Sequence, residues 1–229
     1  MKKLAVTRPP NIGWLEVELD DTEIDYLWEC IKKSGSRIND DLAGNISRSC
    51  VLNDRGNWFF KNTLKSLCEI YKDEFRNLGE SIGCSGRHPY HMDEWWVNYQ
   101  KQNEFNPNHN HFGVYSFVIW MKIPTRKKDQ LKNNEFARVT NAKVVSDFQF
   151  SFLDILGIPQ GYHYEMNPDM EGRMLFFPSK LMHAVYPFYK CGKDRISISG
   201  NISLNTEKSI DSSTLKDYLR SNSNSMEEK

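Results

Sequence analysis

The spacing of hydrophobic residues is helical near the N-terminus and becomes strand-like from about residue 83. Asp20 or Asp21 can cap a first helix. Its apolar side chains, at i, i+3, i+4 and i+7 spacing, are Ile24, Leu27, Trp28 and Ile31. Asn57 can cap a second amphipathic helix, whose pattern continues as far as Leu78. We expect both helices to cover one face of a sheet.

The rest of the pattern alternates between apolar and polar residues. Trp95, Val97 and Tyr99 form one side of the first run. Later strand-like runs cover 114–123, 143–152, 173–177, 182–188 and 195–204. Two helical segments followed by many short strands predict a mainly β protein with flanking α-helices, in which an antiparallel sandwich or barrel carries the helices on its outside.

This pattern divides the chain into three parts of a single domain. We expect a helical support region at 1–82, a β core at 83–205 and a polar tail at 206–229. A total of 229 residues suits one domain of generous size. The charged insert 125–138, TRKKDQLKNNEFAR, interrupts the β pattern, and we expect it to be a solvated loop.

Charge and composition argue against several classes of protein. Lys+Arg and Asp+Glu both number 30, which gives no electrostatic case for binding nucleic acid or an anionic membrane. No apolar run approaches the ~20 residues of a membrane span, and MKKLAVTRPPNIGW lacks the apolar region of a signal peptide. The five cysteines form no C-x-x-C pair, which predicts free thiols in a reducing cytoplasm.

Candidate metal chemistry lies in 107–124, PNHNHFGVYSFVIWMKIP, where two histidines precede the longest apolar run. In a strand, His109 and His111 would point to the same face with their backbones roughly 6.6 Å apart, close enough to bind one metal ion. His183, in PSKLMHAVYPF, is the candidate third ligand. We expect Tyr115, Phe117 and Ile119 to face the interior on the side of His111, unless a bulge at Gly113 changes the register.

A rival metal-binding pair exists at His91 and Asp93. It lies farther from His183 along the chain, and it precedes a Trp-rich strand instead of following one. We therefore favour His109 and His111 as ligands, and leave open whether His91 and Asp93 contribute.

The last strand-like run, RISISGNISL, has two unlike faces. Arg195, Ser197, Ser199 and Asn201 form a polar row, and Ile196, Ile198 and Ile202 form an apolar one. If the isoleucines pack under the helices, the polar row faces the interior of the barrel. A buried arginine is costly unless an anion pairs with it. A carboxylate held by the planar guanidinium and a serine hydroxyl would meet that demand.

Taken together, these motifs resemble the Fe(II)- and 2-oxoglutarate-dependent dioxygenases, in a branch common in bacteriophage and bacterial genomes. The matching segments are the H-x-H pair with FVIWMKIP, then FPSKLMHAVYP, then RISISGN, within roughly 95–201. The resemblance implies a double-stranded β-helix, the jelly-roll or cupin-like core. It also implies that Fe(II) binds to His109, His111 and His183.

The same resemblance implies how the cosubstrate is held and what the reaction is. Arg195 and Ser197 would bind the distal carboxylate of 2-oxoglutarate, and Tyr99 would help to hold it. With O2, the cosubstrate would be converted to succinate while a C–H bond is hydroxylated. The substrate, a small molecule or a protein side chain such as proline, is a family-level expectation, and the location would be the host cytoplasm for a phage protein. The sequence predicts no oligomeric state.

One departure from the family pattern affects the metal site. Most members have Asp or Glu where His111 stands. Three neutral imidazoles leave the site one unit more positive, and a 2-oxoglutarate dianion can offset that charge. Two alternatives stay open: a three-histidine cupin-type metalloenzyme that does not use 2-oxoglutarate, and a non-enzymatic jelly-roll module for binding or for a virion.

Overall fold

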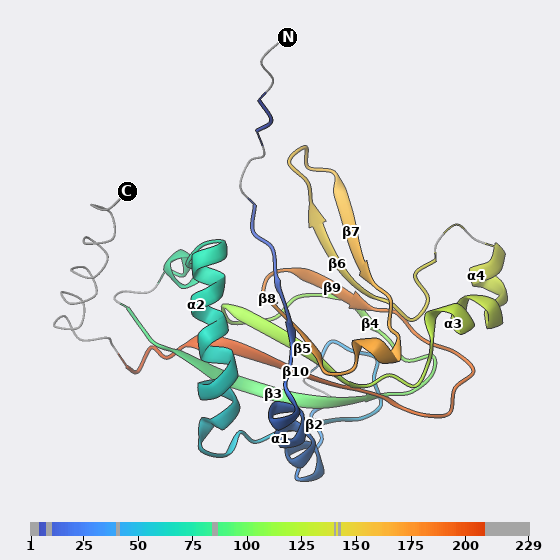
Figure 1. Ribbon diagram of the computed structural model, residues 1–229, viewed down its shortest axis with the longest axis horizontal. Coiled ribbons are helices and arrows are strands. Elements are labelled where there is room, and N and C mark those ends of the chain that lie inside the picture. Colours follow the sequence, from blue (N-terminus) through green and yellow to red (C-terminus); the bar gives the residue numbers. More distant parts are fainter. Residues whose placement is uncertain are drawn as a thin grey trace.

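In the computed structural model, two antiparallel sheets face each other, and helices cover the outer face of the larger sheet (Figure 1). Residues 5–7, 11–39, 42–83, 87–139, 141 and 143–208 are described. In spatial order the larger sheet comprises β1 (Leu15–Glu18), β8 (Arg173–Pro178), β5 (Tyr115–Lys122), β10 (Arg195–Leu204), β3 (Tyr90–Gln100) and β2 (Ser49–Val51). The smaller comprises β4 (Asn106–His109), β9 (Met182–Val185), β6 (Phe148–Leu153) and β7 (Pro159–Tyr164). The mainly β jelly-roll fold with outer helices is confirmed.

The first helix begins where the sequence predicts. Asp20 caps α1 (Asp21–Lys32) by accepting a hydrogen bond from the amide of Glu23 at 2.9 Å. The carboxylate of Glu23 accepts one in return from the amide of Asp20, also at 2.9 Å. This capping box satisfies amide groups that the first turn leaves without helical partners.

The second helix differs from the prediction at both ends. It runs through a π-helical turn, Phe60–Leu64, into α2 (Lys65–Glu74). The carboxylate of Asp54, rather than the side chain of Asn57, accepts hydrogen bonds from the amides of Phe59 and Phe60, both at 2.9 Å. At Phe75 the backbone leaves the helical region, so α2 ends before Leu78. The apolar pattern of the sequence continues to Leu78, but after α2 the chain forms a short 3₁₀ segment, Leu78–Ser81.

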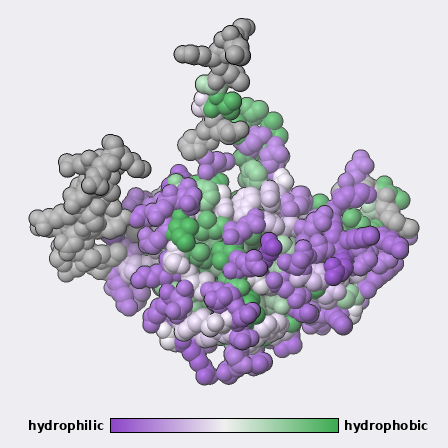
Figure 2. Space-filling model, in the orientation of Figure 1, coloured by the Kyte–Doolittle hydropathy of each residue, from purple (hydrophilic) through white to green (hydrophobic). Residues whose placement is uncertain are grey.

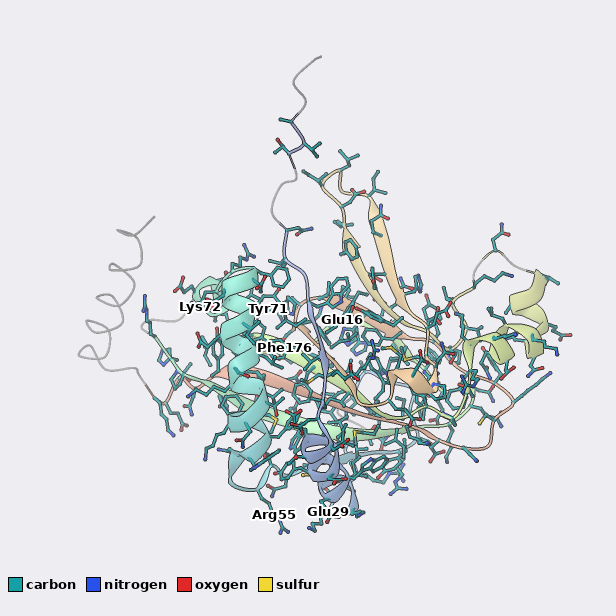
Figure 3. All side chains as sticks on the ribbon, viewed as in Figure 1. Glu16, Glu29, Arg55, Tyr71, Lys72 and Phe176 are labelled. Carbon is teal, nitrogen blue, oxygen red and sulfur yellow. The ribbon has the colours of Figure 1, made fainter. Side chains whose placement is uncertain are left out.

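The larger hydrophobic cluster lies between the helices and the larger sheet. Figure 3 shows Tyr71 of α2 and Phe176 of β8 in this layer, and their ring centroids are 6.3 Å apart. Ile198 and Ile202 of β10 are fully buried in the same cluster. The expected packing of the apolar face of β10 under the helices is therefore confirmed.

The face assigned to β5 is corrected in one respect. Tyr115, Phe117 and Ile119 are buried, as expected, but they pack in the cluster beneath the helices. His111 instead lines a cavity between the sheets, which only Phe117 of these three also borders. Gly113, with φ of 89°, lies between His111 and the start of β5, so the strand register does not carry through.

The charged insert is also corrected, because it is folded and partly buried. It forms α3 (Lys127–Asn133) and the start of α4 (Glu135–Val139). Lys127 and Gln130 are both only 4% exposed. The ammonium of Lys127 pairs with Asp147 at 2.6 Å, which makes burial of both charges tolerable.

A second cluster fills the space between the two sheets, with Trp120 and Phe177 from the larger sheet against Phe148 and Phe150 from the smaller. The surface is mostly hydrophilic, but apolar side chains gather where the β6–β7 hairpin projects (Figure 2). None of the described helices is long and apolar enough to cross a membrane. Of the expected tail at 206–229, residues 209–229 lie outside the described residues.

Candidate active site

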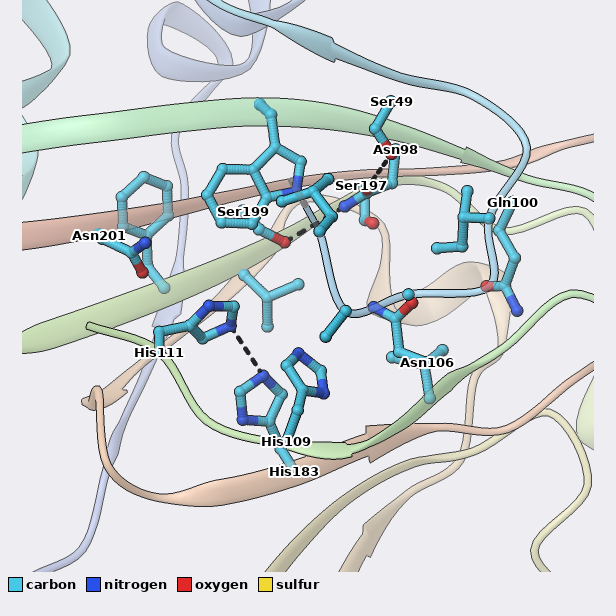
Figure 4. Close-up of a pocket in the computed structure, with 18 of the residues that line it drawn as sticks. Ser49, Asn98, Gln100, Asn106, His109, His111, His183, Ser197, Ser199 and Asn201 are labelled. Carbon is cyan, nitrogen blue, oxygen red and sulfur yellow. Dashed lines mark hydrogen bonds between the residues drawn. The ribbon is translucent and has the colours of Figure 1, made fainter. Parts of the chain in front are cut away.

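Three histidines from two segments of the chain converge at one end of the cavity between the sheets (Figure 4). His109 ends β4, and the pairing of β4 with β9 places it opposite His183. His111 follows in the next loop, where its amide donates to the carbonyl of Ser179 at 2.9 Å. The candidate ligand atoms of the three side chains all lie within 4.8 Å of one another. Among the residues described, this is the only group of three or more such side chains with that spacing.

Backbone carbonyls orient two of the three imidazoles. Nδ1 of His109 lies 2.7 Å from the carbonyl oxygen of Pro107, and Nδ1 of His183 lies 2.9 Å from that of Leu181. An Nδ1–H donating to a carbonyl leaves the Nε2 lone pair free to bind a metal. This is the donor arrangement expected of metal-binding histidines.

Burial also keeps these imidazoles neutral. Desolvation, together with the other two imidazoles, lowers the pKa of His183 to about 3. Desolvation, His109 and the ammonium of Lys180 lower the pKa of His111 to about 4. Burial lowers the pKa of His109 as well. At neutral pH the site therefore offers three uncharged nitrogen donors, and it carries no protons that a metal would have to displace.

Arg195 lies in the wall of the same cavity and is only 2% exposed. One terminal nitrogen donates to Oε1 of Gln100 at 3.4 Å. The other donates to the carbonyl of Ser146 at 3.0 Å and to its hydroxyl. The ring of Phe188 lies beneath the guanidinium, 5.0 Å from its carbon. These contacts place the side chain but supply no negative charge.

The guanidinium of Arg195 has no anionic partner among the described residues. Its Nε has no hydrogen-bond partner, and no carboxylate of the described residues lies within ion-pair distance. Burial lowers the pKa of Arg195 to about 10, so the side chain is still charged at neutral pH. A buried, charged and incompletely bonded arginine fits a carboxylate ligand.

The cavity between these groups measures about 240 Å³. Its polar wall is the row predicted from β10, with Ser197, Ser199 and Asn201 all lining it. Asn98 of β3 donates to Ser199 at 3.4 Å and accepts from Ser49 at 2.7 Å. Asn201 accepts from Ser116 at 2.8 Å. Apolar side chains also line the cavity: Trp120 and Phe177 from the larger sheet and Phe148 from the smaller one.

Residues 94–201 match the model of a protein family described as "Putative 2OG-Fe(II) oxygenase". Over these residues the chain is similar to the 2OG-Fe(II) oxygenase family. Members of this family use Fe(II), 2-oxoglutarate and O2. The three neutral imidazoles fit the metal, and the incompletely bonded Arg195 fits a dicarboxylate. A search of curated proteins gave no match.

Solved structures share this fold at low sequence identity. A 2OG-Fe(II) oxygenase family oxidoreductase from Burkholderia pseudomallei superposes with a TM-score of 0.50 and 10% identity, covering 83% of this chain and 85% of that one. The non-heme alpha ketoglutarate dependent epimerase SnoN gives 0.50 and 13%, covering 85% and 79%. A Pseudomonas putida prolyl-4-hydroxylase gives 0.49 and 14%, covering 85% and 94%. The first two similarities support the double-stranded β-helix fold.

Most of the residues singled out in the sequence lie together around this cavity. His109, His111, His183, Arg195 and Ser197 all line the one cavity. The rival pair does not join them. Among the described residues neither member belongs to a metal-type cluster, and the Asp93 carboxylate accepts a hydrogen bond from Ser203 at 3.4 Å.

Tyr99, in contrast, is not among the residues that line the cavity. Its side chain packs against the cluster beneath the helices, with the guanidinium of Arg48 lying 4.0 Å from the ring centroid. Because side chains alternate along a strand, its neighbours Asn98 and Gln100 line the cavity instead. The alternation of β3 could have identified these two residues.

Two contacts of Arg195 carried no signal in the sequence. Ser146 is held with φ of 69°, in the left-handed region that serine seldom adopts, and only the folded chain brings it to Arg195. Phe188 lies at the end of the predicted run 182–188, but β9 ends at Val185, so Phe188 lies in an irregular segment where strand alternation assigns it to no face.

Proposed function

We propose that His109, His111 and His183 hold Fe(II) and that Arg195 binds the distal carboxylate of 2-oxoglutarate, so that this oxygenase hydroxylates a C–H bond. The observation that carries the proposal is Arg195 itself. A charged guanidinium is buried in the same cavity as three neutral imidazoles, with its Nε unpartnered and no carboxylate of the described residues close enough to pair with it.

The protein's own residues hold, orient and shield the reactants. Ser197 lines the cavity on the same row as Arg195, and we assign its hydroxyl a hydrogen bond to the same carboxylate. Trp120, Phe148 and Phe177 form an apolar wall that excludes water from the reacting groups. Bound Fe(II), with 2-oxoglutarate and O2, supplies the oxidising chemistry, which yields succinate, CO2 and a hydroxylated substrate.

The three-histidine ligand set makes the metal site depend on the cosubstrate for charge. Three imidazoles add no negative charge, whereas two imidazoles and a carboxylate add one. The 2-oxoglutarate dianion brings both charges that the cavity lacks, one at the metal and one at Arg195. We infer that cosubstrate binding strengthens metal retention.

The substrate is proposed as a small molecule or a protein side chain such as proline. Structurally similar proteins differ in this respect, since one is an epimerase from nogalamycin biosynthesis and another a prolyl-4-hydroxylase. We propose a reducing cytoplasm as the location, because Cys30, Cys50, Cys68 and Cys191 are free thiols.

Anaerobic titration of the Fe(II) protein with 2-oxoglutarate tests the proposal. Chelation of the metal by the keto acid is expected to produce a weak visible charge-transfer absorption in the wild-type protein. His183→Ala should lose this absorption, and His91→Ala should retain it. Metal binding without the absorption would favour a cupin-type enzyme that does not use 2-oxoglutarate. Absence of metal binding would favour a non-enzymatic module.

A further inference from the structure

Helix α3 sends two buried polar side chains toward the segments that contact Arg195. Lys127 and Gln130 point inward from this helix, while Lys128 and Asp129 between them are exposed. Neither Lys127 nor Gln130 lines the cavity. Any influence on the cosubstrate must therefore pass through other residues.

Lys127 fastens the turn that precedes β6. Its ammonium donates to the carbonyl of Val145 at 3.1 Å, to the carboxylate of Asp147 at 2.6 Å and to the carbonyl of Lys143. An ammonium has three donors, and this turn uses all of them. The ammonium and the Asp147 carboxylate are both buried, so the contacts are shielded from water and salt.

The fastened turn presents Ser146 to Arg195 in an unfavourable conformation. A serine with φ of 69° persists only where its surroundings hold it. Its amide donates to the carbonyl of Pro187 at 2.9 Å, and its carbonyl and hydroxyl both accept from Arg195. Lys127, which binds the residues on either side of Ser146, supplies much of that constraint.

Gln130 fixes the other wall of the arginine site. Its side-chain amide donates to the carbonyl of Tyr189 at 2.9 Å, and its oxygen accepts from the amide of Tyr189 at 2.8 Å. The preceding residue, Phe188, is fully buried, and its ring supports the guanidinium of Arg195. The paired hydrogen bonds of Gln130 therefore hold the backbone that carries this ring.

We propose that Lys127 and Gln130 are positioning residues for 2-oxoglutarate, acting on Arg195 through Ser146 and Phe188. The inference rests on the proposed function of Arg195 as the anchor of the distal carboxylate. Recognition of a carboxylate by a planar guanidinium requires both groups to be aligned. Loosening either wall lets the guanidinium tilt, which weakens that contact without touching the metal ligands.

The test compares two ligands on the Ni(II)-loaded protein by calorimetry. 2-Oxoglutarate and 2-oxopentanoate share a keto acid end and a five-carbon chain, but only 2-oxoglutarate has the distal carboxylate. In Lys127→Met and in Gln130→Leu, we expect the Kd of 2-oxoglutarate to rise about tenfold, as for loss of one good polar contact. The Kd of 2-oxopentanoate and the bound nickel should not change. Lys128→Met, on the exposed side of the same helix, is the matched control and should behave as wild type.

Three results would contradict this inference in distinguishable ways. Unchanged 2-oxoglutarate binding in both folded variants would remove the positioning role and leave the proposed function intact. An equal loss for both ligands would indicate general loosening of the site instead of positioning. Equal affinity of the wild type for both ligands would overturn the role of Arg195 itself. If Lys127→Met does not fold, Gln130→Leu carries the same test, because it removes no charge.

Discussion

Two substitutions of Arg195 distinguish the contribution of its charge to 2-oxoglutarate binding from the contribution of its planar shape. We expect Arg195→Ala to weaken 2-oxoglutarate binding roughly ten- to a hundredfold, because a hydrogen bond to a charged group is worth about 1.5–3 kcal/mol. Arg195→Lys keeps the charge but loses the planar fork, so it should also bind measurably less tightly. Calorimetry on metal-loaded protein measures both, and metal content should not change. Unaltered affinity in Arg195→Ala would exclude it as the anchor.

The metal ligands make a second prediction at this scale. His109→Ala, His111→Ala and His183→Ala should each lose most of the bound divalent metal, because each removes one of three converging donors. Asp93→Ala should keep it, since that carboxylate lies outside the cluster. Elemental analysis of the purified variants gives the answer. Full occupancy in His111→Ala with loss in Asp93→Ala would move the site to the rival pair.

Single residues also show how far sequence reasoning reaches. Arg195 could be placed in the interior because serines and an asparagine share its row along one strand. Lys127 could not be placed, because a lysine in a charged segment is usually solvated and its partner Asp147 lies on a separate turn. Tyr99 was assigned by likeness to a family position, whereas the alternation of its own strand directs it to the other face.

At the scale of elements, one glycine allows the middle of β10 to pack closely. A Cβ on Gly200 would lie 2.6 Å from Cζ of Phe117 and 2.7 Å from Cβ of Trp95. We expect Gly200→Ala to lower the free energy of unfolding by about 1–3 kcal/mol through overpacking. Gly192→Ala is the control, because a Cβ there would meet nothing within 4 Å. Denaturant unfolding compares the two, and equal stability would show that the strands yield at little cost.

The elements divide into those with a periodic signal and those without one. β10 was predicted with its observed bounds, Arg195–Leu204, because polar and apolar residues alternate along it. β7, Pro159–Tyr164, reads PQGYHY and is exposed at every position except Tyr164, so no buried face imposed alternation on it. β4, which carries His109, is equally polar. Such strands form because adjacent strands of the sheet pair with their backbones, and this pairing leaves no pattern in the sequence of the strand itself.

For the whole molecule, metal binding should stabilise the fold. The three imidazoles come from the β4 region and β9, so an ion joining them links segments that are distant along the chain. At a free metal concentration of 100 Kd the gain is about 2.7 kcal/mol, which corresponds to a rise in Tm of roughly 5–10 °C for a protein of this size. Thermal unfolding with Ni(II) and with a chelator measures it. The variant lacking all three histidines should show no difference between the two conditions.

Strand β10 carries the residues that stabilise the fold on one face and the residues of the candidate site on the other. Its isoleucines pack against the helices, while Arg195, Ser197 and Asn201 face the cavity. Mutations on one row can therefore accumulate with little penalty from the other. A descendant that lost its catalytic row would still fold, and it could persist as an inert shell or acquire a new ligand. The fold and the activity of this protein can thus be inherited separately, because alternate residues of β10 serve one or the other.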